Sequence, residues 1–484
     1  MNTAIVVAAV VAVYFLALSA ISRFASARQG NNNETFFRAG RRSPWQLVAF
    51  GMIGASISGV TFVSVPGMVL TSQMTYLQVC LGFILGYLAV AFILLPVYYR
   101  LNLTTIYAYL GQRFGPHSYT VGSAFFLLSK MVGAAVKFYV VCLILQQFVF
   151  SHAGVSFPAT VALMVLLIWL YTRRRGMATL VFTDTFQTVC LFTALLLIIW
   201  HVMQDMHLSV ADALDAVVGD PRSQVFEWHD LSSPRFFWKQ LLSGAFIVIV
   251  MTGLDQDMMQ KNLTCRTLRD AQKNMCSYSV AFLPANFLFL ALGILLAQWY
   301  TTHVGPTLPA GDSLLPVFVD HHGLAVMLIF TIGIMAASFS SADSALTSLT
   351  TSFCIDICHH PADKQLRQWV HAAMCLVFAA VIVLIYALGS NSLIDTIYTL
   401  VSYTYGPLLG LFAYGLFTRR AVNDRWVPAV CVASPLLCYA IDFWCSRHFD
   451  YHFGYELLML NGLITILGLW LISLCKHEKS EKER

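Results

Sequence analysis

Long apolar segments constrain this chain more than any other feature of its sequence. Runs of about 20 apolar residues recur along all 484 residues, and a helix of that length crosses a hydrocarbon core of about 30 Å. Hydrophobic residues make up 58% of the sequence and charged residues only 11%, and no polar stretch is long enough for a soluble domain. The sequence therefore predicts an all-α polytopic membrane protein, with one membrane domain over residues 1–484.

Thirteen transmembrane helices are expected. They cover residues 3–20, 46–69, 77–99, 120–149, 157–171, 179–202, 238–260, 276–300, 323–353, 367–388, 395–417, 426–443 and 455–475. The first run has neither a basic leader region nor a small-residue cleavage site, so it is interpreted as a retained helix rather than a signal peptide.

The distribution of lysine and arginine indicates how the spans are oriented. Basic residues are retained on the cytoplasmic side of membranes, and an outside N-terminus places most of them there, including the run 173–175 and Lys261. The opposite side receives only Arg222, Arg235, Lys239 and Arg447. We expect the N-terminus outside and the C-terminus in the cytoplasm. The net charge of +5 is thus a topology signal and does not indicate a nucleic-acid partner.

One apolar helix carries an unusual number of hydroxyl groups. In AASFSSADSALTSL, residues 336–349, a single helix face is shared by Ala337, Ser340, Ser341, Ser344 and Ser348. Neutral hydroxyl and carbonyl oxygens suit a monovalent cation without the cost of a buried charge. We call this face the serine stripe and interpret it as half of a sodium site. The alternative is that the serines bond their own backbone or pack as small residues.

The second half of such a site needs backbone carbonyls that are free of helical hydrogen bonds. The segment GMIGASISGVTF, residues 51–62, interleaves three glycines with Ser56 and Ser58, which predicts an interrupted helix with inward carbonyls. Glycines that only pack against a neighbouring helix are the alternative.

An aspartate lies in apolar surroundings near the start of the sixth span. Asp184, in TDTFQ (183–187), is a functional candidate because a buried unpaired carboxylate is costly. The alternative is a carboxylate near the cytoplasmic end of the span that pairs with an arginine such as Arg175.

Five segments in chain order resemble the sodium:solute symporters of the LeuT fold. They are TFFRAGRRSPW (35–45), LNLTTIYAYLGQRFG (101–115), DQDMMQKNL (255–263), the serine stripe and YGPLLGLFAYGLFTRR (405–420). The resemblance covers nearly the whole chain. It implies two inverted five-helix repeats, at about 46–202 and 238–417, which follow an N-terminal helix and cytoplasmic loop (1–45) and precede two C-terminal helices (426–475).

The resemblance also implies where sodium binds. The family's conserved site falls on the carbonyls of Gly54, Ile57 and Ala337 and on the hydroxyls of Ser340 and Ser341. In members that use a second sodium, an aspartate that matches Asp184 works with the same two serines. Sodium coupling is therefore expected, with two ions favoured over one.

The family's substrate lies between the second, fourth, seventh and eleventh spans. The polar positions of the sialic-acid-transporting branch match Ser56, Ser58 and Thr61, which keep their hydroxyls, but that branch's arginine aligns with Gly133. Sugar-transporting members have amide side chains where this chain has Ser56 and Thr61, and an aromatic gate near Met251. The solute is thus open among sugar acids, sugars, carboxylates and vitamins.

Two lysines and a polar turn complete the candidate residues. Lys137 lies one turn after Gly133, and we hypothesise that it helps to bind an anionic or polyhydroxylated substrate. For Lys137 and Lys130, Asp343 or Asp184 could serve as partners, and purely structural or snorkelling lysines are the alternative. Gate residues are expected in the turn at the end of the seventh span, with a solvated helix end as the alternative: Asp255, Gln256, Asp257 and Gln260.

The expected function is sodium-coupled uptake of a small polar organic solute by alternating access. A proton-coupled or uncoupled carrier of the same fold, with Asp184 as proton acceptor, is the alternative. Clusters of catalytic residues at facing helix ends are missing, so an enzyme is not expected. Sodium is the only metal ion that we expect, and we expect no organic cofactor. The expected partners are the solute and the lipid bilayer, with no obligate protein partner. The expected location is a cell membrane, namely the bacterial inner membrane.

Overall fold

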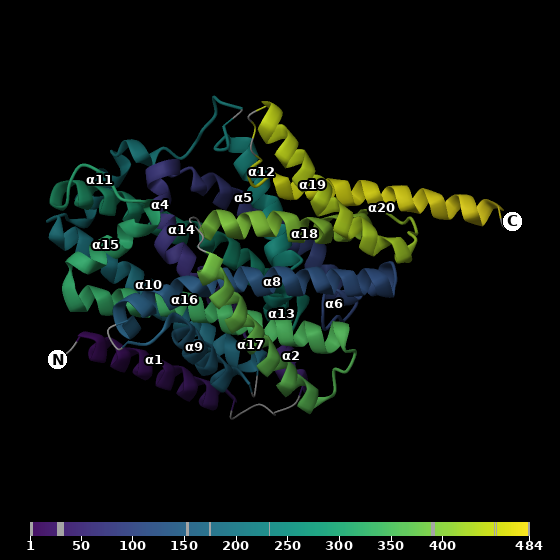
Figure 1. Cartoon of the computed structure of the whole chain (residues 1–484), viewed down its shortest axis with the longest axis horizontal. Helices are drawn as coiled ribbons and strands as arrows, with labels where there is room; N and C mark the ends of the chain where they lie inside the picture. Colours follow the sequence, from purple (N-terminus) through teal and green to yellow (C-terminus); the bar gives the residue numbers. More distant parts are fainter. Residues whose placement is uncertain are drawn as a thin grey trace.

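Helices account for the regular structure of the described part of the chain. The computed structural model describes residues 3–482 except 27–32, 152–153, 174–175, 232, 389–392, 450 and 452. Within these residues the one β-type pairing is an isolated bridge between Ser43 and Cys265. Figure 1 shows α1 along one margin of the molecule and α20 projecting at the opposite side. The prediction of an all-α protein is confirmed.

Helices cover every predicted span, although two spans are each made of a bent pair of helices. The long helices are α1 (Thr3–Ser26), α5 (Tyr76–Ala89), α8 (Pro116–Leu145), α9 (Phe157–Thr172), α10 (Met177–Asp205), α14 (Leu268–His303), α16 (Gly323–Ser352), α17 (Lys364–Leu388), α18 (Leu393–Phe417), α19 (Val427–Phe449) and α20 (Leu457–Lys482). Among the described residues, nine helical segments are long and apolar enough to cross a membrane, or eleven when two bent pairs are included. The count of thirteen spans stays a prediction.

The second span is broken, as the glycine and serine pattern predicts. Helix α3 (Trp45–Ser56) and helix α4 (Gly59–Ser72) meet at 63°. Ile57 between them has extended backbone, with φ −80° and ψ 99°, so the helical hydrogen bonding stops there. Ser58 then caps α4 through its side chain.

The seventh span is also broken, and the prediction of a continuous helix over 238–260 is wrong. Helix α12 (Phe237–Val248) continues through a π-helical turn (Ile249–Gly253) and meets α13 (Gln256–Asn262) at 70°. The physical reason is Asp255, which has extended backbone and accepts hydrogen bonds from the backbone N–H groups of Asp257 and Met258. This N-cap starts a new helix in a new direction.

Short helices occupy the connections between the spans, where the sequence analysis expects only loops. They are α2 (Asn33–Arg38), α7 (Ala108–Arg113), α11 (Val210–Val218) and α15 (Leu314–His321). Ser209 and Asp212 form a capping box at the start of α11, which is a signal that the sequence contains.

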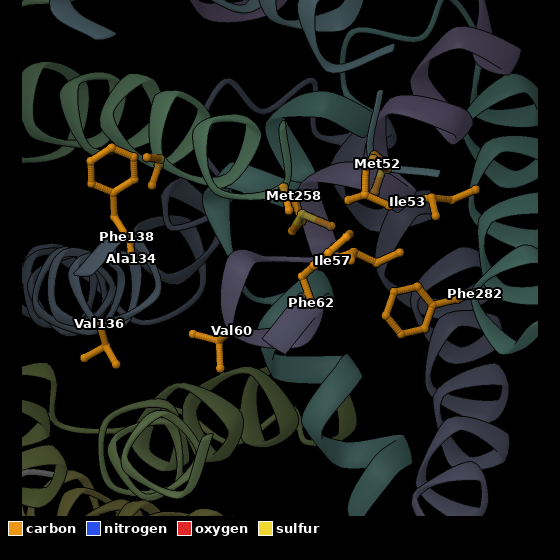
Figure 2. Close-up of a cluster of buried hydrophobic side chains, with 14 of the residues drawn as sticks. Met52, Ile53, Ile57, Val60, Phe62, Ala134, Val136, Phe138, Met258 and Phe282 are labelled. Carbon is orange, nitrogen blue, oxygen red and sulfur yellow. The ribbon is translucent and has the colours of Figure 1, made fainter. Parts of the chain in front are cut away.

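Two glycines let the first break approach its neighbours closely. A Cβ atom at Gly54 would lie 2.0 Å from the Thr188 hydroxyl on α10, and one at Gly59 would lie 2.1 Å from the Ser338 hydroxyl on α16. The packing explanation for the glycines therefore holds together with the broken-helix explanation. Buried apolar side chains flank the break, with Ile53, Ile57 and Phe62 drawn in one cluster beside Met258 of α13 (Figure 2). The break is thus fixed between α10 and α16.

Candidate functional site

A cavity of about 150 Å³ lies beside the first break. Its walls come from α3, α4, α5, α8, the α12–α13 break, α14, α16 and α18. All the residues predicted to bind substrate line it, namely Ser56, Ser58, Thr61 and Lys137, as does Gly133. The structure therefore brings together side chains that the sequence analysis takes from two separate spans.

Tyrosine hydroxyls extend the polar lining in a way that the sequence analysis missed. The hydroxyls of Ser56 and Tyr278 are 2.5 Å apart, and Tyr87 donates to Tyr278 at 2.8 Å. Tyr87 and Tyr278 come from α5 and α14, and single tyrosines in apolar helices carry no sequence signal for this role. The chain of hydroxyls links the break to two helices that are not part of the sodium site.

Ser58 and Thr61 also have a structural role. The Ser58 hydroxyl accepts from the backbone N–H of Thr61 at 3.5 Å, and the Thr61 hydroxyl accepts from the backbone N–H of Ser58 at 3.3 Å. This reciprocal pair is a capping box that starts α4. Both side chains are thereby held at the cavity wall in one orientation.

Lys137 faces the cavity without a partner. No hydrogen bond or ion pair joins its ammonium group to the described residues, so the idea that Asp343 or Asp184 pairs with it is wrong. Gly133, one turn earlier on α8, leaves open space, because a Cβ atom there would meet nothing within 4 Å. The cavity thus presents an ammonium group without a direct contact to a carboxylate, beside an unfilled position.

Lys130 is fully engaged, but with other carboxylates than those expected. Its ammonium lies 3.2 Å from Asp255 Oδ1 and 2.7 Å from Asp257 Oδ2. Tyr405 on α18 donates to Asp255 Oδ2 at 2.6 Å. Because the 70° bend turns the start of α13 toward α8, these two aspartates reach Lys130, whereas Asp343 and Asp184 do not pair with it.

The serine stripe lies against the first break, where it contacts the carbonyl of Ala55 rather than those expected at Gly54 and Ile57. Ser341 donates its hydroxyl hydrogen to the carbonyl oxygen of Ala55, in the last turn of α3, at 2.7 Å. Ser340 donates to Asp184 Oδ1 at 2.8 Å. Ala337 and Ser340 have no exposed surface. The arrangement gathers hydroxyl, carbonyl and carboxylate oxygens from three helices, which is the chemistry that a hard cation such as sodium requires.

Asp184 pairs with a lysine that the sequence analysis placed in the cytoplasm. Lys261 Nζ lies 2.8 Å from Asp184 Oδ2, and the two side chains are only 3% and 2% exposed. The expectation for Lys261 is wrong because α13 bends across the bundle and turns this side chain inward. The alternative partner, Arg175, lies outside the described residues.

The expected gate residues are buried, so the alternative interpretation, a solvated helix end, is wrong. Gln256 donates to the Thr104 carbonyl at 3.1 Å and accepts from the Ile106 backbone N–H at 2.9 Å. Gln260 donates to the Phe37 carbonyl at 2.7 Å and to the Thr351 hydroxyl at 3.0 Å. Helix α13 is therefore bonded to three separate segments at one end of the bundle.

Tyrosines satisfy the carbonyl groups that the second break exposes. Tyr98 donates to the Gly253 carbonyl and Tyr107 to the Leu254 carbonyl, each at 2.8 Å. Backbone groups at membrane depth need such partners when a helix is interrupted. Side chains thus satisfy the carbonyl groups at the second break, and both breaks line the cavity.

The sequence of this chain matches the model of one protein family. A model described as the sodium:solute symporter family matches residues 36–425. The sodium/sialic acid symporter NanT of Aliivibrio fischeri is 26% identical over 97% of this chain and 93% of its own length. SiaT of Proteus mirabilis, also a sodium/sialic acid symporter, is 25% identical over 93% of each chain, and the human sodium/iodide cotransporter is 24% identical over 81% of this chain and 62% of its own.

Solved structures share the fold. A sodium-coupled sialic acid symporter in a substrate-bound outward-open state superposes with a TM-score of 0.82, at 20% identity, over 97% of this chain and 98% of its own. The nucleobase-cation-symport-1 transporter Mhp1, in a closed conformation, superposes with a TM-score of 0.60 at 15% identity, over 94% of this chain and 97% of its own. These identities support the LeuT-like fold and no finer statement.

Proposed function

This chain belongs to the sodium:solute symporter family, and from that premise we propose how its first break and its buried charges couple sodium to one class of solute. It is a multi-pass membrane transporter with a LeuT-like fold and acts as a sodium-coupled symporter rather than an enzyme. We propose the residues that bind sodium and solute, the chemical class of the solute, and the orientation of the chain in the membrane.

Sodium binds between the break in the second span and the serine stripe. The observation that carries this assignment is the hydrogen bond from Ser341 to the Ala55 carbonyl, because it brings α16 to the turn where α3 ends. The carbonyls of Gly54, Ile57 and Ala337 and the hydroxyls of Ser340 and Ser341 supply the ligands. A sodium ion would take over the Ala55–Ser341 contact and pull the two helices onto a common centre.

The solute is a small organic anion with hydroxyl groups, of the sugar-acid type. Lys137 supports this class, because its ammonium faces the cavity with no partner among the described residues and would gain a carboxylate there. Ser56, Ser58 and Thr61 are suited to hydroxyl groups of the solute. NanT and SiaT are sialic acid symporters, but Gly133 stands where the resemblance implies an arginine, so the carboxylate would bind one turn along α8.

Transport proceeds by alternating access in a cell membrane, with the N-terminus outside and the C-terminus in the cytoplasm. Residues 46–202 and 238–417 form the two inverted repeats, and 1–45 and 426–475 flank them. The bonds of Gln256 and Gln260 hold α13 against the cytoplasmic segments until sodium and solute have bound. Their release then opens the path inward. The bacterial homologues support a bacterial inner membrane.

Uptake by purified protein in liposomes tests this function. Labelled sugar acids, neutral sugars and monocarboxylates are offered under an inward sodium gradient, an inward potassium gradient, and a proton gradient without sodium. We expect accumulation of an anionic solute with sodium only. Accumulation under the proton gradient alone would overturn the sodium assignment, and sodium-driven uptake of a neutral sugar in preference to its acid would overturn the role of Lys137.

A further inference from the structure

We propose that Lys261 is a tethered cation that fills the position beside Asp184, so that this chain binds one sodium ion where its carboxylate and serines would otherwise hold two. The inference rests on the proposed sodium site between the first break and the serine stripe, and it deepens that site by setting its ion count. It replaces the expectation that two ions are favoured.

Both carboxylate oxygens of Asp184 already contact a partner. One carboxylate oxygen accepts from Ser340 at 2.8 Å, and the other lies 2.8 Å from Lys261 Nζ. Gly51 packs closely against the stem of this side chain, because a Cβ atom there would lie 3.0 Å from the Asp184 Cβ atom. An ammonium group at this distance does for the carboxylate what a sodium ion would do, since it supplies one positive charge in direct contact.

A sodium ion and the ammonium cannot both occupy this place. Both would carry a full positive charge at contact distance from the same carboxylate, in surroundings where each side chain is at most 3% exposed. Repulsion between like charges is weakly screened in such surroundings. Sodium would bind at Asp184 only if Lys261 left, and a buried lysine without a counter-charge is strongly disfavoured.

Other buried charges keep Lys261 where it is. Asp257 on α13 and Asp343 on α16 attract its ammonium group electrostatically, as Asp184 does. Lys130 is held by Asp255 and Asp257 and does not reach Asp184. Asp343 Oδ2 accepts from Tyr171 at 2.7 Å, whereas its Oδ1 has no hydrogen-bond partner among the described residues. The surplus of carboxylates favours a permanent cation at this point.

Because the ammonium group belongs to α13, the position of the charge beside Asp184 depends on the position of that helix. Lys261 follows Gln260 directly, and Gln260 bonds α13 to Phe37 and Thr351. The charge beside Asp184 therefore moves only when α13 moves. In a symporter with two free sodium ions, by contrast, that charge would leave by diffusion.

Sodium binding to the purified full chain tests the inference. The number of sodium ions is obtained from radioactive sodium bound at saturation, and from the slope of stabilisation against the logarithm of sodium concentration at constant ionic strength. Wild type is expected to bind one ion. Lys261→Gln removes the charge but keeps a long polar side chain, so it should bind two ions and show about twice the wild-type slope. Lys261→Arg keeps the charge and should behave as wild type.

A double variant in which both buried charges are removed controls for misfolding of Lys261→Gln. The double variant Asp184→Asn with Lys261→Gln has no unpaired buried charge and should return to one ion. Two ions in wild type, or one ion in a folded Lys261→Gln protein, would overturn the inference while leaving the sodium site intact. Absence of any sodium-dependent stabilisation in wild type would overturn the proposed function itself.

Discussion

The hydroxyl of Ser341 on α16 donates to the carbonyl oxygen of Ala55 on α3 at 2.7 Å, and so joins two residues that are 286 positions apart in the chain. Because Ala55 precedes the break at Ile57, this bond locates the serine stripe beside the interrupted helix. The proposed sodium site follows from that proximity.

Ser341→Ala should weaken sodium binding. Removal of one ligand from a buried polar site costs about 1–3 kcal/mol, which corresponds to a loss of about fivefold to a hundredfold in affinity. The measurement is the sodium concentration that half-saturates thermal stabilisation, with potassium as the balancing ion.

Ser348→Ala provides a matched control for Ser341→Ala. Ser348 belongs to the same stripe, but its hydroxyl donates to the Ala345 carbonyl of its own helix at 2.9 Å. Its loss should leave sodium affinity unchanged. Equal effects of the two substitutions would show that general packing of α16, and not ligation, is responsible.

Lys137→Gln should lower affinity for an anionic solute by roughly tenfold to a hundredfold, because a hydrogen bond to a charged group contributes about 1.5–3 kcal/mol. Sodium-dependent stabilisation without solute should stay as in wild type. Lys137→Arg, which keeps the charge, should retain most of the affinity. Solute binding is measured by calorimetry in sodium. Wild-type affinity in Lys137→Gln would remove Lys137 from the binding site.

Gly133→Arg should be accommodated and should strengthen binding of carboxylates. A Cβ atom at this position meets no neighbour within 4 Å, and replacement of a helical glycine is itself favourable by up to about 1 kcal/mol. The comparison is with Gly133→Gln, which adds similar bulk without charge. Tighter carboxylate binding in the arginine variant alone is the expected result, and equal binding in both variants would contradict it.

Lys130→Met should destabilise the fold. It leaves Asp255 and Asp257 without their cation, and loss of one partner from a buried ion pair costs about 3–5 kcal/mol. The melting temperature in detergent should fall clearly, whereas Lys130→Arg should change it little. An unchanged melting temperature in Lys130→Met would mean that the two aspartates find other partners.

The sequence predicts the spans and the first break but not the second. Glycines and serines in 51–62 predict an interrupted helix, whereas the segment before Asp255 is apolar and predicts one continuous helix. An aspartate that ends a span and an aspartate that caps a new helix look alike in sequence. Only the packing of α13 against its neighbours distinguishes them.

The partners of the buried charges were the least predictable part of the site. Lys261 stands before the basic residues Arg266 and Arg269, so its charge looks like a topology signal. Its contact with Asp184 spans two helices and depends on the 70° bend, which no local pattern specifies. The candidate residues could be identified from the sequence, but the pairs they form could not.

The direct test of the account is a simultaneous measurement of sodium and solute flux into liposomes that contain the wild-type protein. One sodium ion and one monoanion carry no net charge together, so the account predicts a flux ratio near one and no effect of an imposed membrane potential. A second sodium would instead add about 2.3 kcal/mol of driving force per 100 mV. A ratio near two with potential-dependent uptake would contradict the role of Lys261, and solute flux without sodium would contradict the coupling itself.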